Sequence, residues 1–353
     1  MKHLLSIFDS GNISFSSRGN LHCGFRFIKQ LVMGSSRDLQ FDGLKFILIF
    51  LVVLGHLTFN DPGIGVKRMI YSFHMPVFIF LSGYFTSLSS DKDKRIKWLK
   101  QTLIILFFAH VAQYLLLILM GLTSSLINDY PFQISSVLKR SSFINPAFTL
   151  WYLVSLIYWR IATWIIGNKV NDIALFVVSC IVAILVGFIP LRNEFSFQRT
   201  FSFAPFFVLG VFFKKRHLIS KLEKIPILFA IVGFVVGLLL AREMPNYYPV
   251  DHYTTWGGVV LRTKQMLLAL FLCLLVVRVS RSKFSEFFAR FGSKTLWIYI
   301  GHAYLIILGH RIAHFLGWST GIIGALFVAA LYCTIIILVA YSYTALRKRK
   351  AVS

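Results

Sequence analysis

The segment GLKFILIFLVVLGHLTF, residues 43–59, decides the fold class of this chain. Apart from Lys45 near its start and His56 near its end it carries no ionisable side chain, and it is about as long as a bilayer's hydrocarbon core is thick. Further apolar stretches follow, separated by charged loops, which is typical of a polytopic membrane protein. An ionisable side chain at such depth is costly, so we expect His56 to face a cavity, a partner or a substrate.

The composition of the whole chain agrees with this interpretation. Of its 353 residues, 57% are hydrophobic and 16% aromatic, and the mean hydropathy is +0.73, which is more apolar surface than one soluble core could bury. We therefore predict an all-α bundle of about ten transmembrane helices. The predicted spans are residues 43–59, 71–88, 96–121, 148–167, 172–190, 200–213, 226–241, 259–278, 294–309 and 319–345.

Proline and glycine modify one of these predicted spans. The sixth contains Pro205 and Gly210, and we expect the helix to be broken there. A broken helix at membrane depth is tolerated where it lines a cavity.

The net charge of +24 follows membrane topology rather than a nucleic-acid-binding surface. With the N-terminus inside, 25 Lys and Arg residues fall in segments on the inner side and 10 in segments on the outer side. The positive-inside rule therefore predicts that both termini are cytoplasmic. The same charge would attract anionic lipids or an anionic substrate. The expected surroundings are the lipid bilayer, and no nucleic-acid partner is expected.

The chain is predicted to form one membrane domain, residues 34–353. Residues 1–33 are polar, lack periodicity and contain no apolar signal-peptide core, so we interpret them as a disordered or mis-assigned extension. The four cysteines show no CxxC spacing and three of them lie in apolar segments. Neither a disulfide framework nor a metal site is expected from that pattern.

Candidate chemistry concentrates in the first two apolar segments. Asp42 and Lys45 are three residues apart, which makes them neighbours on a helix. His56 follows Lys45 by eleven residues, about three turns, so both point the same way. His74 opens the next segment, where Pro76 suits the first turn of a helix. An ion pair at a helix start and histidines bonded to carbonyls are the plainer interpretation, but a neutral imidazole is also the cheapest proton-handling group to hold there.

Other candidates lie further along the chain. Tyr299 and His302 are three residues apart in the ninth segment and therefore share a helix face. Two inner basic clusters could bind the phosphates of a nucleotide-bearing donor, although a topology signal explains them equally. These clusters are Arg95, Lys97 and Lys100, and Lys214, Lys215 and Arg216. Arg160 and Arg199 are further candidates, His310 and His314 are interpreted as interfacial, and Tyr247, Tyr248, Tyr253 and Trp256 as an interfacial aromatic belt.

These residues resemble the acyltransferase-3 family of integral-membrane O-acyltransferases, and within it the fucose 4-O-acetylase-like branch. The similarity extends from about Arg37 to the end of the chain and is most specific in the first two segments. It is carried by residues 37–45 with His56, 73–78, 82–84, 94–100, 150–153, 205–210 and 292–302.

The resemblance implies a multi-pass enzyme of the bacterial inner membrane. Such proteins take an acyl group, most often acetyl from acetyl-CoA on the cytoplasmic side, and place it on a sugar hydroxyl of a cell-surface or exported glycan. The family's basic residue eleven positions before its essential histidine maps onto Lys45 and His56. Many relatives have Arg in place of Lys45, and many carry a glutamate in the fourth-helix region, where residues 150–160 contain none.

Roles for the candidate residues follow from the resemblance together with their chemistry. His56 is expected to be the general base or a transient acyl carrier, with Asp42 and Lys45 ordering the cytoplasmic entrance. His74 or His302 would polarise the thioester carbonyl or bind the acceptor. The two basic clusters would hold the phosphates of acyl-CoA, the donor substrate. Contacts to the substrate are expected from Tyr152, Arg160, Arg199 and Tyr299.

Two other classes of function stay open at this level. A secondary transporter or flippase also needs buried histidines and broken helices. A non-catalytic subunit of a polysaccharide-export system would use the histidines only structurally. Release of a thiol from acetyl-CoA separates the enzyme from both.

Overall fold

The computed structural model describes residues 38–57, 65–88, 91–128, 150–167, 169–190, 194–245, 248, 252–315 and 321–350. Within these ranges all regular structure is helical. The α-helices are α2 (Leu39–Leu57), α3 (Val66–Tyr84), α4 (Lys92–Asn128), α6 (Trp151–Ile166), α7 (Asp172–Leu185), α8 (Phe197–Lys215), α9 (Ile219–Glu223), α10 (Ile227–Glu243), α11 (Trp256–Ser280), α12 (Lys283–Gly292), α13 (Thr295–Phe315) and α14 (Ile322–Lys350), with 3-10 turns η3 (Val186–Phe188) and η4 (Glu194–Ser196).

The all-α prediction is confirmed, and a helix lies at each of the ten predicted segments. Four helices of the described chain are long and apolar enough to cross a membrane. They are Leu39–Leu57, Lys92–Thr123, Trp256–Ser280 and Ile322–Tyr343. Shorter apolar helices are Trp151–Ile166, Asp172–Phe188 and Thr295–Ile307. The number of ten spans and their orientation stay predictions.

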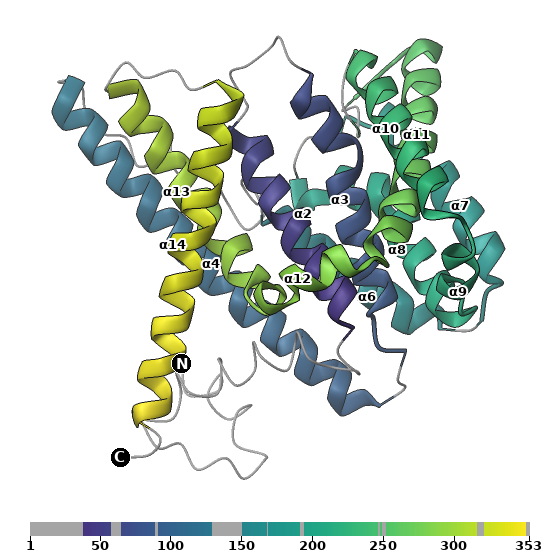
Figure 1. Ribbon diagram of the computed structural model, residues 1–353, viewed down its shortest axis with the longest axis horizontal. Coiled ribbons are helices and arrows are strands. Elements are labelled where there is room, and N and C mark those ends of the chain that lie inside the picture. Colours follow the sequence, from purple (N-terminus) through teal and green to yellow (C-terminus); the bar gives the residue numbers. More distant parts are fainter. Residues whose placement is uncertain are drawn as a thin grey trace.

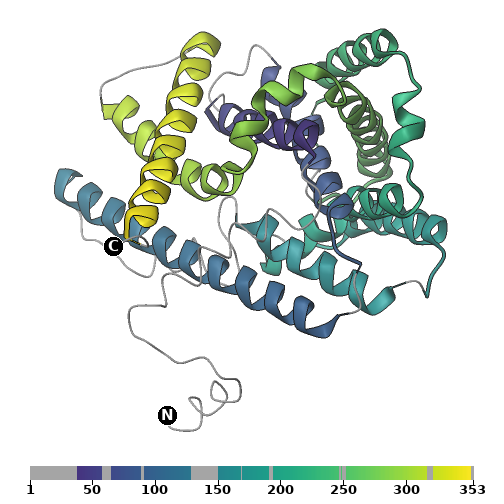
Figure 2. The ribbon, with the colours of Figure 1, turned by 60° about the horizontal axis from the view of Figure 1, so that its bottom comes forward.

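Helices α2 and α3 occupy the middle of the bundle (Figure 1). The pair α13 and α14 lies on one side of them, and α7, α8, α10 and α11 lie on the other (Figure 1). The longest helix, α4, runs along one side of the bundle, where it packs on α6 and α13 (Figure 2). The core between these elements is formed largely by aliphatic and aromatic side chains.

Close backbone contact fixes the crossing of α3 and α8. A Cβ atom on Gly83 would lie 2.0 Å from the carbonyl oxygen of Phe207, and one on Gly210 would lie 2.0 Å from that of Phe80. Only glycine fits at either position, because each helix presents its bare backbone to the other. Gly210 therefore serves this contact rather than a break in the helix.

Two predictions about proline were wrong. Helix α8 is continuous from Phe197 to Lys215, with Pro205 buried in its interior. Helix α3 begins at Val66, so His74 and Pro76 lie in its interior rather than at its opening. Proline removes one helical hydrogen bond, and the packing of α8 on α3, α6 and α7 maintains the helix despite that loss.

Helix α12 lies where the sequence predicts only an inner charged loop. It crosses α2, with Ser285, Ala289 and Gly292 buried against the bundle. Phe284 and Phe287 lie on its exposed side. A short amphipathic helix of this kind suits a membrane surface better than a span.

Candidate active site

Three helices bring His56, His74 and His302 together. The ring of His56 on α2 lies 5.7 Å from that of His302 on α13, measured between centroids, with the planes tilted by 36°. Tyr71 on α3 links His56 to His74. Its ring centroid is 6.2 Å from that of His56 and 4.9 Å from that of His74, and its hydroxyl lies 3.4 Å from Nδ1 of His56. Sequence segments nearly 250 residues apart thus meet in one group of imidazole rings.

Two of these rings have a defined hydrogen-bond pattern. Nδ1 of His74 lies 2.7 Å from the carbonyl oxygen of Ile70, and Nδ1 of His302 lies 2.9 Å from that of Ile298. A carbonyl can only accept, so Nδ1 donates in both, and Nε2 of each neutral ring carries the lone pair. His302 is fully buried, and its Nε2 has no hydrogen-bond partner among the described residues. Such an atom is a proton acceptor held out of water.

A tyrosine pair continues from the histidines towards α6. The Tyr299 ring lies 6.3 Å from His302 and 5.5 Å from Tyr152, measured between centroids. The hydroxyl of Tyr152 and Oγ of Ser82 on α3 are 2.6 Å apart. Tyr152 and Tyr299, both expected to contact substrate, therefore lie beside the histidine group. Arg199 stacks on Trp151 at 5.3 Å and is within electrostatic range of His56.

The two basic clusters expected to hold phosphates are placed differently. Arg95 is half-buried and lies 5.7 Å from the Trp164 ring, while Lys97 and Lys100 are exposed on the surface of α4. Lys214 turns inward, where its Nζ donates to the carbonyl oxygen of Thr86 at 2.9 Å. The other two residues of its cluster do not join it, because both contact the Asp172 carboxylate: Lys215 at 2.8 Å and Arg216 at 3.7 Å.

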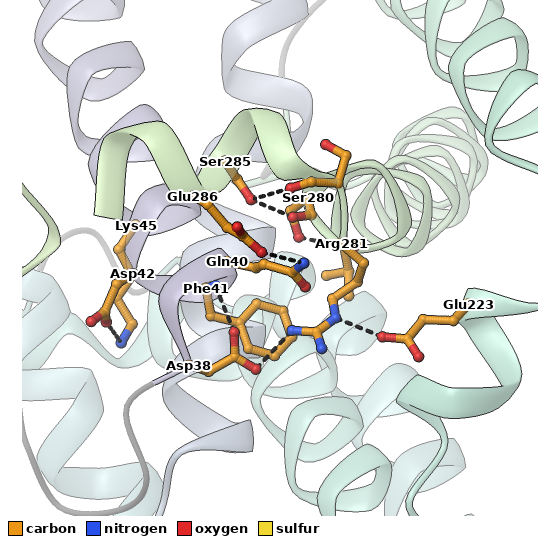
Figure 3. A network of polar contacts seen from close by, with 12 residues as sticks. Asp38, Gln40, Phe41, Asp42, Lys45, Glu223, Ser280, Arg281, Ser285 and Glu286 are labelled. Carbon is orange, nitrogen blue, oxygen red and sulfur yellow. Dashed lines mark hydrogen bonds and ion pairs between the residues drawn. The ribbon is translucent and has the colours of Figure 1, made fainter. Parts of the chain in front are cut away.

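The start of α2 is held by a polar network (Figure 3). Lys45 pairs with Asp42 at 3.2 Å, which confirms that they are neighbours, and its Nζ lies 4.2 Å from the Phe85 ring. Asp38 accepts from the backbone N–H of Phe41 at 3.1 Å and caps the helix. Its second carboxylate oxygen lies 2.7 Å from Arg281, which follows α11.

Arg281 also bonds Glu223 on α9 at 2.7 Å, so one guanidinium joins three parts of the chain (Figure 3). Partial burial acts to lower the pKa of Arg281, but its hydrogen bonds to Glu223 and Asp38 outweigh burial and raise that pKa above its usual value. Its charge is therefore permanent. The network positions α2, which carries both Lys45 and His56.

The aromatic belt was predicted partly wrongly. Tyr248 and Tyr253 are buried, and their hydroxyls donate to the carbonyl oxygens of Ser202 and Ile184. They are held inside by hydrogen bonds that the sequence does not reveal. Trp256 is 81% exposed and fits the belt. Tyr247 and the side chains of His310 and His314 lie outside the described residues.

Two buried or site-lining residues were not predicted from the sequence. Tyr71 lies three residues before His74, a helical spacing that would have been a usable signal. Arg262 is fully buried on α11 and donates to the carbonyl oxygen of Ala183 and to Oγ of Ser202, both at 3.0 Å. In the sequence it was only one of several outer-side charges.

Comparison with known proteins places the chain in a family. A family model described as an acyltransferase domain matches residues 38–344. The chain is similar to nodulation protein NolL of Sinorhizobium fredii (strain NBRC 101917 / NGR234), with 46% identity over 61 residues that cover 15% of this chain and 17% of that protein. It is similar to nodulation protein NolL of Mesorhizobium japonicum (strain LMG 29417 / CECT 9101 / MAFF 303099), with 43% identity over 61 residues, 15% of this chain and 16% of that protein. No solved structure gives a significant match. Because the family model covers most of its length, this chain belongs to the acyltransferase-3 family of O-acyltransferases.

Proposed function

We propose that this protein transfers an acyl group, acetyl in the first instance, from acyl-CoA to a sugar hydroxyl of a cell-surface or exported glycan. The family supplies the reaction class. The resemblance to fucose 4-O-acetylase-like proteins supports a sugar hydroxyl as the acceptor. One observation carries the chemistry. Nε2 of buried His302, which has no hydrogen-bond partner in the part of the chain that the structure describes, lies on a ring adjacent to that of half-buried His56.

The chemistry needs a proton acceptor and a path for the proton. The acceptor hydroxyl attacks the thioester carbonyl, a C–O bond forms, the C–S bond breaks, and the hydroxyl proton passes through an imidazole to the departing CoA sulfur. His56 is the more accessible ring and is oriented by Tyr71, so it receives that proton. The neighbouring lone pair on His302 stabilises the charged imidazolium that forms. His74 holds Tyr71 through ring contact.

The donor reaches this group from the cytoplasm in our proposal. Ten spans with both termini inside would put Lys45, Arg95 and Lys214 at the inner ends of α2, α4 and α8. This is the side where the chain concentrates its Lys and Arg residues. Tyr152 and Tyr299 form a ring series that ends at His302, and they would line the path of the acyl arm.

Thiol release from acetyl-CoA by the purified full-length protein, with free fucose as the first acceptor, tests the proposal. His56→Ala and His302→Ala should each lower the rate by about 100-fold or more, because general-base catalysis contributes that much. His110→Gln on α4 is the matched control, since that buried ring bonds the carbonyl four residues back in the same way. Near-normal rates in both variants, or glycan movement without thiol release, would contradict the proposal.

A further inference from the structure

Arginine and tryptophan side chains alternate along the seam between α4 and α6. Arg95 lies 5.7 Å from the ring of Trp164, the rings of Trp164 and Trp98 meet edge-on at 5.7 Å, and Arg160 lies 4.2 Å from the ring of Trp98. Arg95 is near the start of α4 and half-buried, whereas Arg160 lies about 9 Å before the end of α6 by helical rise. The series therefore leads from the basic end of the bundle into its interior.

Three hydrogen-bond donors along this seam have no partner among the described residues. Nε of Arg160, Nε1 of Trp98 and Nε2 of Gln101 are all buried and have no hydrogen-bond acceptor within the described part of the chain. Gln101 is one helical turn from Trp98 and shares its face of α4. No carboxylate pairs with Arg160 among the described residues, and Lys214 lies within electrostatic range of it. Buried donors normally find acceptors, so three beside an unpaired cation indicate an absent anion rich in oxygen.

We propose that Trp98, Gln101 and Arg160 form a phosphate subsite that holds the diphosphate of the acyl-CoA donor. This assignment rests on the proposed function and specifies which residues bind its donor. A guanidinium stacked on an indole is already oriented for phosphate, because the ring holds its plane while its N–H groups stay available.

The position of the subsite fits the reaction centre. Arg160 and Tyr152 are eight residues apart on α6, about 12 Å along the helix, and Tyr152 leads through Tyr299 to His302. An extended pantetheine arm can span that separation. A donor whose diphosphate is bound at Arg160 would thus place its thioester near the histidines.

The test compares two donors that differ in the 3′-phospho-ADP part of CoA, which contains the diphosphate. Acetyl-CoA carries it and acetyl-pantetheine does not. For Arg160→Gln, KM for acetyl-CoA should rise roughly 10- to 100-fold, as expected for loss of a charged hydrogen bond, while kcat for both donors and KM for acetyl-pantetheine stay near wild type. Trp98→Phe, which keeps an aromatic ring but removes the indole N–H, should raise KM for acetyl-CoA by about 3- to 10-fold.

Two variants control for folding and for charge. Arg160→Lys keeps the cation and should restore part of the affinity for acetyl-CoA. Arg290→Gln removes an exposed arginine of α12 that stacks on Phe291 at 4.8 Å, and it should change neither KM.

The outcomes separate the subsite from the proposed function. Equal losses with both donors would show that Arg160 is structural and overturn the subsite. A defect that appears in nanodiscs of phosphatidylglycerol but not of phosphatidylcholine, and that is the same with both donors, would assign the site to an anionic lipid headgroup and also overturn it. If the wild-type protein turns over neither donor, the proposed function fails. Calorimetry with ADP then decides the subsite: weaker binding by Arg160→Gln but not Arg290→Gln supports it, and equal binding rejects it.

Discussion

Replacing Gly43 by alanine should force α2 and α12 apart. A Cβ atom at this position would lie 1.6 Å from the carbonyl oxygen of Ser285, whereas real Cβ contacts essentially never fall under 3.0 Å. The helices would have to separate by at least the difference, 1.4 Å. The obstacle is backbone on both sides, so no side-chain rotation can relieve it.

The magnitude follows from three contributions. Overpacking of this kind costs about 1–3 kcal/mol. Separation would also stretch the partly exposed pair of Arg281 with Asp38, at a further cost of about 0–1 kcal/mol, and alanine returns about 1 kcal/mol of helix propensity. The expected net loss in the free energy of unfolding is about 0–3 kcal/mol. Because α2 also carries His56, acyl transfer should fall by at least about tenfold, since a 1 Å misplacement can cost about 100-fold.

Thermal unfolding in one detergent and thiol release from acetyl-CoA measure the two effects on the same preparation. Gly233→Ala on α10 is the control, because its Cβ would meet the flexible end of Leu275 at 3.1 Å and Cζ of Phe271 at an ordinary contact distance of 3.5 Å. Its melting temperature should be close to that of the wild type, and it should keep its activity. A Gly43→Ala protein that melts at or above the wild-type temperature with full activity would refute the tight crossing of α2 and α12.

Two further substitutions test the surroundings of the candidate site. Lys214→Gln should raise KM for acetyl-CoA several-fold, because Lys214 turns inward. Lys215→Gln should instead lower the free energy of unfolding by about 1 kcal/mol, because Lys215 is paired with Asp172. A larger rise in KM for Lys215→Gln than for Lys214→Gln would reverse this assignment. Tyr152→Phe should cost about 0.5–1.5 kcal/mol in unfolding free energy by removing the hydroxyl bonded to Ser82. Adding Ser82→Ala should cost less in this variant than in the wild type, where the same change also removes the bond to Tyr152. Strict additivity of the two losses would show that the bond contributes nothing.

The helices were predictable because the signal for them is local. An apolar run of about 20 residues between charged loops defines a helix by its own composition, and a helix lies at every predicted segment. The pair of Asp42 and Lys45 and the shared face of Tyr299 and His302 were predictable for the same reason, since helical spacing alone sets them.

Local rules failed where packing outweighed them. Pro76 and Pro205 were interpreted as marking a helix start and a break, yet both lie inside continuous helices. Tyr248 and Tyr253 were assigned to a surface belt because tyrosine favours interfaces, but hydrogen bonds to buried carbonyls hold them inside. Helix α12 was missed because its basic residues were counted only as a topology signal.

The sequence by itself determined that this chain is helical, apolar and rich in cations at the ends of its apolar segments, and it marked His56, His74 and His302 as exceptional. Only the tertiary structure decided that His56 meets His302, that Arg160 lies over Trp98, and that Arg281 joins Asp38 to Glu223. The physical reason is that such contacts depend on how each helix is rotated about its axis and where it crosses its neighbours. Close approaches such as Gly43 to Ser285 and Gly83 to Phe207 set those crossings, and they join residues far apart in the chain.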